Sequence, residues 1–513
     1  MSTTVRTRYA PSPTGFQHIG GIRTALFCYL FTKKMGGKMV LRIEDTDRSR
    51  YVEGAEQYII DALNWCGIEV DEGVHLGGDY GPYRQSDRKA LYQENVQKLL
   101  DKGEAYYAFD TPEELQALRE ELEKSKAASR QYGVSTRMRM KNSLTLSEAE
   151  TQALLDEGVP YVVRIRIPED EIVTIHDVVH GTVQVESNLL DDKILMKADG
   201  MPTYHLANVV DDHYMQITHV IRGDEWLPST PLHAVLYKAF GWQDTMPKFA
   251  HLPLILKPTG KGKLSKRAAD KLGFSVFPLA WQHPTKDESS SGFAEDGFLP
   301  EAFINMLAFL GWNPGNEQEI FSMQELIEIF SLDRIQKAGA KFNFDKAKWF
   351  NEQHLRAKTD AELTALVQAV SPEKYADVDA ELLQKAVVMM RDRLTFAKDF
   401  WENATYFFDK PTTYDAKVVR KKWKEERKPL FVILRNRLEM LENFSAAEIE
   451  KTVKDFIEET KLGFGNVLQV FRVMLAGTMA GPDIFEMAAI LGQTEVIDRM
   501  NVAAEKMDEM KAA

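Results

Sequence analysis

The sequence predicts a multidomain protein in which an α/β part with a parallel sheet precedes an all-α part. Two strand-like segments, residues 5–9 and 38–43, alternate with helix-like segments at residues 23–35 and 53–65, and this alternation is typical of a parallel sheet covered by helices. From Phe298 onward nearly every segment has helical periodicity instead. The length of 513 residues exceeds what one hydrophobic core usually organises, so several domains are expected.

A Pro/Gly turn follows the first expected strand and leads into the first expected helix. It comprises residues 10–15 (Ala-Pro-Ser-Pro-Thr-Gly) and the segment His18-Ile19-Gly20-Gly21. Backbone N–H groups and the His18 side chain would converge there at a helix N-terminus, which is a favourable place for an anion. The alternation of strand-like and helix-like segments suits a Rossmann-type nucleotide domain, and we assign its first half to residues 1–101.

The pattern changes over residues 102–199, which we interpret as an α/β insertion in the sheet domain. A charged helical segment at residues 111–126 is followed by strand-rich segments at residues 161–167 and 182–185. The second half of the Rossmann-type domain then resumes over residues 200–255.

A short basic motif, Lys263-Leu264-Ser265-Lys266-Arg267, opens the next segment, residues 256–345, which we interpret as a loop and a linking helical domain. If folding brings this motif beside His18, ATP can bind between them, with His18 and Lys266 on phosphate oxygens as charge builds on the α-phosphate. Each motif alone is weak evidence, because Gly-rich turns are often mere connections and basic loops are often solvated surface. The two motifs in this order are more specific.

The segment from Leu272 to Pro300 is rich in proline, serine and glycine. This composition predicts a long exposed loop. We therefore expect the protein to fold without it.

The last domain, residues 346–513, is predicted to be helical and carries a basic patch. The patch includes Lys417, Arg420, Lys421, Lys422 and Arg435, with Trp423 among them. A net charge of −13 does not exclude an RNA partner, because phosphate binding depends on local patches. From the residues alone, RNA contact and a merely solvated helix face remain equally open.

The cysteines and the apolar segments exclude several classes of protein. The two cysteines, Cys28 and Cys66, lie in apolar helix-like segments, which predicts buried thiols and no zinc or other metal site. Apolar stretches fall far short of the roughly 20 residues that span a bilayer, and the N-terminal residues lack a signal-peptide pattern. We expect a cytoplasmic protein without a membrane span.

Together the motifs resemble signatures of class I aminoacyl-tRNA synthetases. His18–Gly21 and Lys263–Arg267 are similar to the HIGH and KMSKS motifs, with Gly21 and Leu264 departing from them as in the glutamyl branch. Further blocks resemble bacterial-type glutamyl-tRNA synthetases: residues 8–15, 41–47, 200–208 and 219–226. Residues 471–492 are similar to the C-terminal helical region of that family, more loosely.

This resemblance implies a fold and an activity. The fold is a Rossmann-type catalytic domain, an α/β insertion that grips the acceptor end of tRNA, and a C-terminal helical anticodon-binding region. The reaction joins L-glutamate to tRNA(Glu) through a glutamyl-adenylate, with ATP as substrate and Mg²⁺ bound chiefly by ATP. We expect a monomer without structural zinc. The position of the basic patch in the anticodon-binding region favours RNA contact, with Lys417, Arg420, Lys421, Lys422 and Arg435 as the candidate residues.

The resemblance also assigns roles to individual residues. The catalytic residues are His18, Lys263 and Lys266. The ATP-binding residues are Pro11, Gly15, His18, Gly20, Gly21, Lys263, Leu264, Ser265, Lys266 and Arg267. The glutamate-binding residues are Arg8, Ala10, Ser12, Glu44, Tyr204, Asn208 and Arg222. Glutamate carries two carboxylates and an ammonium, so guanidinium groups and one carboxylate suit its pocket.

Other functions fit the residues less well. Arg8 and Arg222 disfavour a glutaminyl-tRNA synthetase, because the side-chain amide of glutamine would lose a charge-assisted bond to a guanidinium group. A nondiscriminating glutamyl enzyme, which also charges glutamine tRNA, stays open. A truncated relative that modifies a tRNA base lacks the C-terminal helical region. A silent RNA-binding paralogue would not need His18, Lys266, Arg8 and Glu44. A small-molecule adenylating enzyme would leave the last third unexplained.

Overall fold

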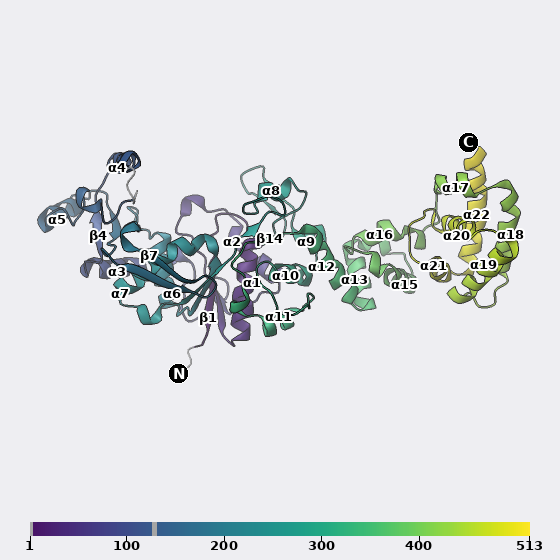
Figure 1. Ribbon diagram of the computed structural model, residues 1–513, viewed down its shortest axis with the longest axis horizontal. Coiled ribbons are helices and arrows are strands. Elements are labelled where there is room, and N and C mark those ends of the chain that lie inside the picture. The colour runs from purple at the N-terminus through teal and green to yellow at the C-terminus, as the bar shows by residue number, and fades with distance from the viewer. Residues whose placement is uncertain (1–3, 126–130, 513) are drawn as a thin grey trace. The chain divides into compact units, whose positions relative to one another are not determined.

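The computed structural model describes residues 4–125 and 131–512 (Figure 1). The chain forms two compact units, Met1–Phe350 and Asn351–Ala513. Helix α4 runs over Pro112–Ser125, and the last residue of the helix expected there, Lys126, lies outside the described residues.

A seven-stranded sheet forms the centre of the first unit, in the order β3-β2-β1-β9-β10-β6-β7. The strands are β1 (Arg6–Tyr9), β2 (Lys38–Leu41), β3 (Glu72–Gly73), β6 (Ile172–Asp177), β7 (Gly181–Glu186), β9 (His219–Gly223) and β10 (Lys248–Leu252). All neighbours are parallel except the antiparallel hairpin of β6 and β7. The predicted parallel sheet is confirmed.

Helices connect the strands and bury apolar side chains against them. They are α1 (Ile19–Lys34), α2 (Ala55–Trp65), α3 (Lys89–Asp101), α6 (Tyr204–Tyr214) and α7 (Thr230–Phe240). Helix α1 packs on β1, β2 and β9, and its Ile22, Leu26 and Leu30 are fully buried. It begins at Ile19, directly after the N-cap residue His18, and so starts at the Gly20-Gly21 segment where the turn predicts a helix N-terminus.

The strand order reverses between β1 and β9. From β1 the chain passes through α1 to β2 on one side, whereas β9 leads through α7 to β10 on the other. Such a reversal leaves a crevice at the carboxyl ends of the two strands, where α/β proteins bind ligands. The fold thus brings the turn after Tyr9 close to Arg222 and Gly223, which are far away in sequence.

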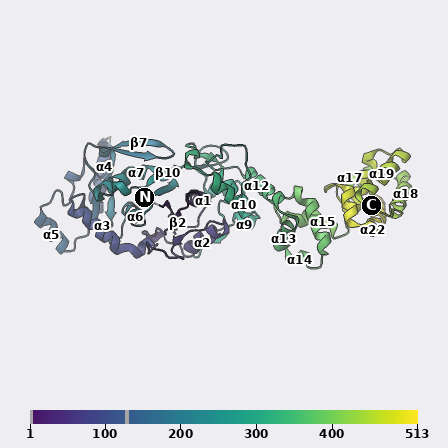
Figure 2. The same ribbon diagram turned by 90° about the horizontal axis from the view of Figure 1, so that it is seen from below.

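The insertion contributes a smaller sheet and part of the main one. Strands β4 (Ala105–Ala108), β5 (Val162–Ile165) and β8 (Ile194–Met196) form an antiparallel sheet, accompanied by α4 and α5 (Glu148–Asp156). Figures 1 and 2 show α4 and α5 at one end of the first unit, away from α10. Strands β6 and β7 also fall within residues 102–199, yet they extend the main sheet through β10.

The prediction of an exposed loop between Leu272 and Pro300 is wrong. The segment forms a hairpin of β12 (Trp281–Gln282) and β13 (Ser289–Ser290), followed by α9 (Phe293–Asp296). Phe274, Val276, Phe277 and Phe293 are buried, and the longest exposed stretch is residues 284–289, at and beside the hairpin tip. A few aromatic side chains outweigh the polar composition around them, because each buries a large apolar area.

The rest of the first unit links this segment to the sheet. The elements are β11 (Ile255–Leu256), α8 (Lys266–Asp270), α10 (Pro300–Ala308), α11 (Met323–Ile329), β14 (Ala340–Lys341) and α12 (Phe344–Ala357), which continues into the second unit. Strands β11 and β14 pair in parallel, and α10 and α11 pack on α1.

The second unit is helical, as predicted. Its helices are α13 (Asp360–Val370), α14 (Pro372–Tyr375), α15 (Ala380–Met390), α16 (Asp399–Ala404), α17 (Ala416–Lys422), α18 (Lys428–Glu439), α19 (Ala446–Thr460), α20 (Phe464–Ala476), α21 (Ile484–Leu491) and α22 (Gln493–Ala512). Thr359 and Glu362 form a capping box at the start of α13. The sequence pattern predicts one helix over residues 381–398, but α15 already ends at Met390.

Replacing Phe293 with alanine tests whether the 272–300 segment is part of the core. The Phe293 side chain is fully buried, with ring centroids 4.9 Å from both Phe298 and Phe303. We expect Phe293→Ala to lower the free energy of unfolding by about 3–5 kcal/mol, measured by denaturant titration. Lys286→Ala, at the exposed hairpin tip, is the control and should change little. Equal stability of the two variants would contradict the packing described here.

Candidate active site

A cavity of about 540 Å³ opens at the carboxyl ends of β1 and β9. The residues singled out in the sequence that line it are Arg8, Ala10, Pro11, Ser12, His18, Gly20, Gly21, Glu44, Tyr204, Asn208, Arg222, Lys263, Leu264, Ser265 and Lys266. Gly15 and Arg267 do not line it. Folding therefore brings the two sequence motifs to one cavity, while the role of each residue stays a prediction.

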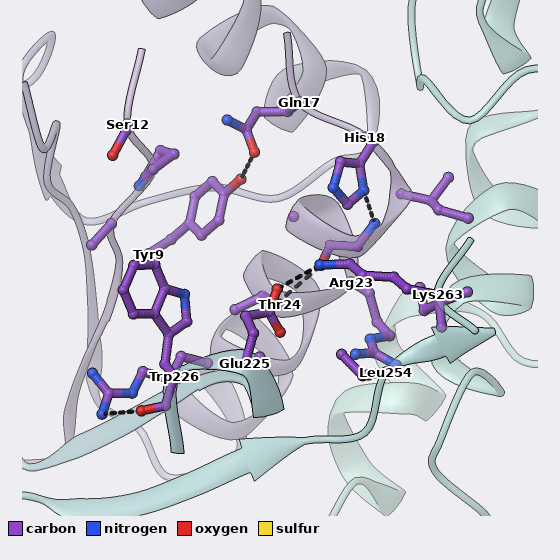
Figure 3. Close-up of a pocket in the computed structure, with 18 of the residues that line it drawn as sticks. Tyr9, Ser12, Gln17, His18, Arg23, Thr24, Glu225, Trp226, Leu254 and Lys263 are labelled. Carbon is purple, nitrogen blue, oxygen red and sulfur yellow. Dashed lines mark hydrogen bonds and ion pairs between the residues drawn. The ribbon is translucent and has the colours of Figure 1, made fainter. Parts of the chain in front are cut away.

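The start of α1 forms one wall of the cavity. His18 accepts a hydrogen bond at Nδ1 from the backbone N–H of Gly20, at 2.9 Å (Figure 3). Enclosure by the cavity walls lowers the pKa of His18, and the nearby Lys263 ammonium lowers it further. With Nδ1 accepting, the neutral ring carries its proton on Nε2, where it can be donated to a ligand oxygen.

The paired glycines are required by close approach. A Cβ at Gly20 would lie 2.6 Å from Cε1 of His18, and one at Gly21 would lie 2.4 Å from Oε1 of Gln17. The Gln17 side chain is itself fixed, because Tyr9 donates to the same Oε1 at 2.9 Å (Figure 3). A larger residue would therefore displace the groups that shape this end of the cavity.

Two lysines reach the same end of the cavity. Lys263 donates to Oε1 of Glu225 at 2.8 Å (Figure 3), and both side chains are about half exposed. The ammonium of Lys266 lies 4.3 Å from the ring centroid of Trp281, which stacks on Phe16 at 4.4 Å. Exposed ion pairs and cation–π contacts are weak, so both ammonium groups can exchange these partners for an anion.

A buried ion network supports the opposite end of the cavity. Arg42 is fully buried and donates to Oδ1 of Asp212 at 2.8 Å and to Oε1 of Glu44 at 3.0 Å. Arg8 donates to the same Asp212 oxygen at 3.1 Å. Asn208 adds a bond to Oε1 of Glu44 at 3.1 Å. Within the described part of the chain, Oε2 of Glu44 takes no hydrogen bond from a protein donor.

Burial and the ion network shift the pKa values of Glu44 and Asp212 in opposite directions. Burial raises the pKa of Glu44 above its usual value, although Arg42 and Arg8 oppose the shift. Burial also acts against ionisation of Asp212, but Arg8 and Arg42 outweigh it and hold the pKa of Asp212 below the usual range. Asp212 is therefore a fixed anion between two guanidinium groups, whereas the charge of Glu44 needs a further cation.

Arg222 has a different environment. It is buried and donates through Nη1 to the Tyr204 hydroxyl at 2.8 Å and through Nη2 to Oγ1 of Thr230 at 2.9 Å. Among the described residues, no carboxylate forms an ion pair with it. Burial lowers its pKa. A buried guanidinium with neutral partners favours an anionic ligand.

Two family models match the chain. The catalytic domain of class I tRNA synthetases (E and Q) matches residues 4–349, and an anticodon binding domain matches residues 362–504. A glutamate–tRNA ligase of Amoebophilus asiaticus is 51% identical over 98% of each chain, and that of Phocaeicola vulgatus is 52% identical over the same shares. The chain belongs to the glutamate–tRNA ligase family. A solved glutamate tRNA ligase of Elizabethkingia meningosepticum, in complex with its amino acid, is similar with a TM-score of 0.93 and 46% identity, over 98% of this chain and all of that one.

Membership of this family confirms the resemblance seen in the sequence and the predicted class of fold. Class I synthetases use ATP, which agrees with a cavity that carries two lysines and a helix N-terminus. No helix in the described ranges combines the length and the apolar character needed to cross a membrane.

The basic patch of this glutamate–tRNA ligase family member divides into two groups. Lys417, Arg420 and Lys421 are exposed on one helix, α17. The other two candidates are half-buried and bonded to amide side chains: Lys422 to Asn466 and Arg435 to Asn501.

Trp423 does not belong to the surface of that patch. It is 2% exposed and donates to Asp508, so it packs in the core of the second unit and has no face free for a base.

The cysteines are buried thiols, as predicted. Burial raises the pKa of Cys28 to about 12, far from any pH at which it would be a reactive thiolate. The residues that the structure describes contain no group of three or more His, Cys, Asp or Glu side chains that could hold a metal ion.

Sequence reasoning assigned no role to Arg42 and did not consider Asp211 and Asp212. A signal was present, because Asp211 and Asp212 follow Val209 and Val210 on a helix whose neighbouring residues are apolar. Charged residues on an otherwise buried helix need partners. Their partners, Arg8, Arg42 and Arg88, come from other segments, so only the fold identifies them.

Replacing Arg42 with methionine tests the network. Removal of this cation leaves Asp212 and Glu44 buried with too little positive charge, and we expect a loss of about 3–5 kcal/mol in the free energy of unfolding. Arg84→Met is the control, since Arg84 pairs with Glu56 in a half-exposed position and should contribute about 0–1 kcal/mol. Urea denaturation measures the free energy of unfolding of both variants. Similar losses of this free energy in the two variants would contradict a special role for Arg42.

Proposed function

We propose that this protein ligates L-glutamate to tRNA(Glu) at the expense of ATP, through a glutamyl-adenylate, with release of pyrophosphate and AMP. The observation that supports it is a single cavity with an anion-binding helix start and two lysines at one end and buried charged groups for an amino acid at the other. Membership of the glutamate–tRNA ligase family supports the same reaction.

The amino-acid end would take glutamate by charge. Oε2 of Glu44 is available for the α-ammonium group, which would supply the cation that the buried carboxylate lacks. The α-carboxylate must stay mobile enough to attack phosphorus, so the buried Arg222 would instead hold the side-chain carboxylate. Arg8, Ala10, Ser12, Tyr204 and Asn208 would complete this pocket.

The other end would bind the triphosphate. His18 would donate from Nε2 to a phosphate oxygen, and Lys263 and Lys266 would leave Glu225 and Trp281 for the pyrophosphate part. An α-carboxylate oxygen of glutamate forms a bond to the α-phosphorus, and the bond to pyrophosphate breaks. A ribose hydroxyl of the terminal tRNA adenosine then attacks the acyl carbon, and AMP leaves. Positioning and charge stabilisation are sufficient for both steps.

Mg²⁺ would enter with ATP. The carboxylates that line the cavity are Glu44 and Glu225, and each already holds a cationic group of the protein. Phosphate oxygens are therefore the main Mg²⁺ ligands in this proposal. The protein would act as a cytoplasmic monomer.

The tRNA would be bound by parts outside the cavity. The insertion, residues 102–199, separates the two catalytic halves, 1–101 and 200–255, in the sequence. It would hold the acceptor end of the tRNA. Residues 256–345 would link these to the anticodon-binding domain, residues 346–513. There the exposed Lys417, Arg420 and Lys421 would offer phosphate contacts, and the half-buried Lys422 and Arg435 are further candidates.

Aminoacylation with radiolabelled amino acids tests the proposal. Glutamate and glutamine are each supplied with ATP and Mg²⁺ to purified glutamate and glutamine tRNAs from one source. Glutamate on its own tRNA alone is the expected result, and glutamate on both would identify a nondiscriminating enzyme. Transfer of neither amino acid would overturn the proposed activity.

Lys266→Ala tests the phosphate role of the basic motif. We expect adenylate formation, measured by ATP–pyrophosphate exchange with tRNA present, to slow about 100-fold because one charge contact in the transition state is lost. Lys271→Ala removes an exposed cation five residues away and should leave the rate unchanged. An equal rate for both variants would rule out this role for Lys266.

A further inference from the structure

The guanidinium of Arg222 is held from behind by a buried histidine. Nε of Arg222 donates to Nε2 of His251 at 3.0 Å, and His251 is fully buried on the neighbouring strand β10. Together with the bonds to Tyr204 and Thr230, this contact fixes the plane of the guanidinium. The contact exists only while Nε2 of His251 is an acceptor.

A second buried residue selects that form of His251. Nδ1 of His251 lies 2.6 Å from Oδ2 of Asp177, at the end of β6, and Asp177 is 4% exposed. The other oxygen, Oδ1, accepts from the backbone N–H groups of Val179 and His180, both at 2.9 Å. Burial opposes ionisation of Asp177, but the bonds from His251 and from these N–H groups outweigh it and hold the pKa of Asp177 below its usual value. Asp177 is therefore a carboxylate that only accepts, so Nδ1 of His251 donates to it and Nε2 faces Arg222 without a proton.

We propose that Asp177 and His251 are positioning residues that aim Arg222 at the ligand and thereby make the pocket prefer a carboxylate to a neutral amide. This inference rests on the proposed function, because it concerns the pocket for the glutamate side chain. Every partner of Arg222 is neutral in this arrangement, so the ligand supplies the anion that the buried cation lacks.

Asp177→Asn reverses the direction of the hydrogen bond between residue 177 and His251, with almost no change in side-chain shape. The backbone N–H groups of Val179 and His180 require the amide oxygen of the new residue. Its NH₂ group then donates to Nδ1 of His251, which moves the ring proton to Nε2. Two N–H groups would face each other between His251 and Arg222, and the guanidinium would turn away.

A pair of His251 variants separates positioning from packing. Glutamine places an amide oxygen four bonds from Cα, as Nε2 of histidine is, and can accept from Arg222. Methionine has the same length but ends in a methyl group. His251→Gln should therefore retain most of the glutamate preference, whereas His251→Met should lose it.

The experiment measures KM and kcat for charging with glutamate and with glutamine, together with KM for ATP and Tm. Asp177→Asn and His251→Met should raise the glutamate KM about 10- to 100-fold, lower the preference for glutamate by a similar factor, and leave the ATP KM within about twofold. His219→Gln, a histidine on β9 that does not contact Arg222, is the control and should match the unmodified protein.

Two results would overturn the inference. Equal losses in His251→Gln and His251→Met with a lowered Tm would show that His251 only fills space. Unchanged glutamate KM values in Asp177→Asn and His251→Met would show that Arg222 needs no support. Calorimetry measures the affinity of the pocket for glutamate without the ligase reaction. If the unmodified protein binds glutamate but charges no tRNA, the proposed function is refuted. The glutamate affinities of the variants would still test the role of Asp177 and His251.

Discussion

The fully buried ion pair of Arg42 with Asp212 is the constraint on which the site depends. It joins the end of β2 to α6. Asp212 also pairs with Arg8 and Arg42 with Glu44, and both Arg8 and Glu44 line the cavity. Buried charges of this kind add little net stability, because their desolvation opposes their attraction. Their geometry is strict, however, and any shift of α6 against the sheet would leave a charge unpaired. The network therefore fixes the spacing of the pocket walls.

The end of the cavity that holds Arg8, Glu44 and Arg222 is more rigid than the end that holds Lys263 and Lys266. Arg8, Glu44 and Arg222 are buried, and each is bonded to other buried side chains. Lys263 and Lys266 are more exposed and rest on replaceable partners. This division suits a reaction in which an amino acid is selected by charge, while a polyphosphate must enter, change its bonding and leave as pyrophosphate.

The sequence predicted the parallel sheet, the helical second unit and the fifteen singled-out residues that meet in one cavity. Periodicity and short motifs carry that information, because they depend on neighbouring residues. The ion network, the support behind Arg222 and the packing of Phe293 depend on contacts between distant segments, such as Arg42 with Asp212 and Asp177 with His251. Local composition was misleading at residues 272–300, where buried rings outweigh a polar majority.

The stack of Phe16 on Trp281 affects the basic motif before any nucleotide is present. The ammonium of Lys266 lies over the ring of Trp281 in this stack. Leu264 is buried, and its backbone N–H donates to the carbonyl oxygen of Ile255. A free loop of this size loses conformational entropy when it closes on a ligand. Here part of that entropy is already lost when the chain folds. A nucleotide bound as proposed would exchange contacts with an ordered loop and would not have to organise a disordered one.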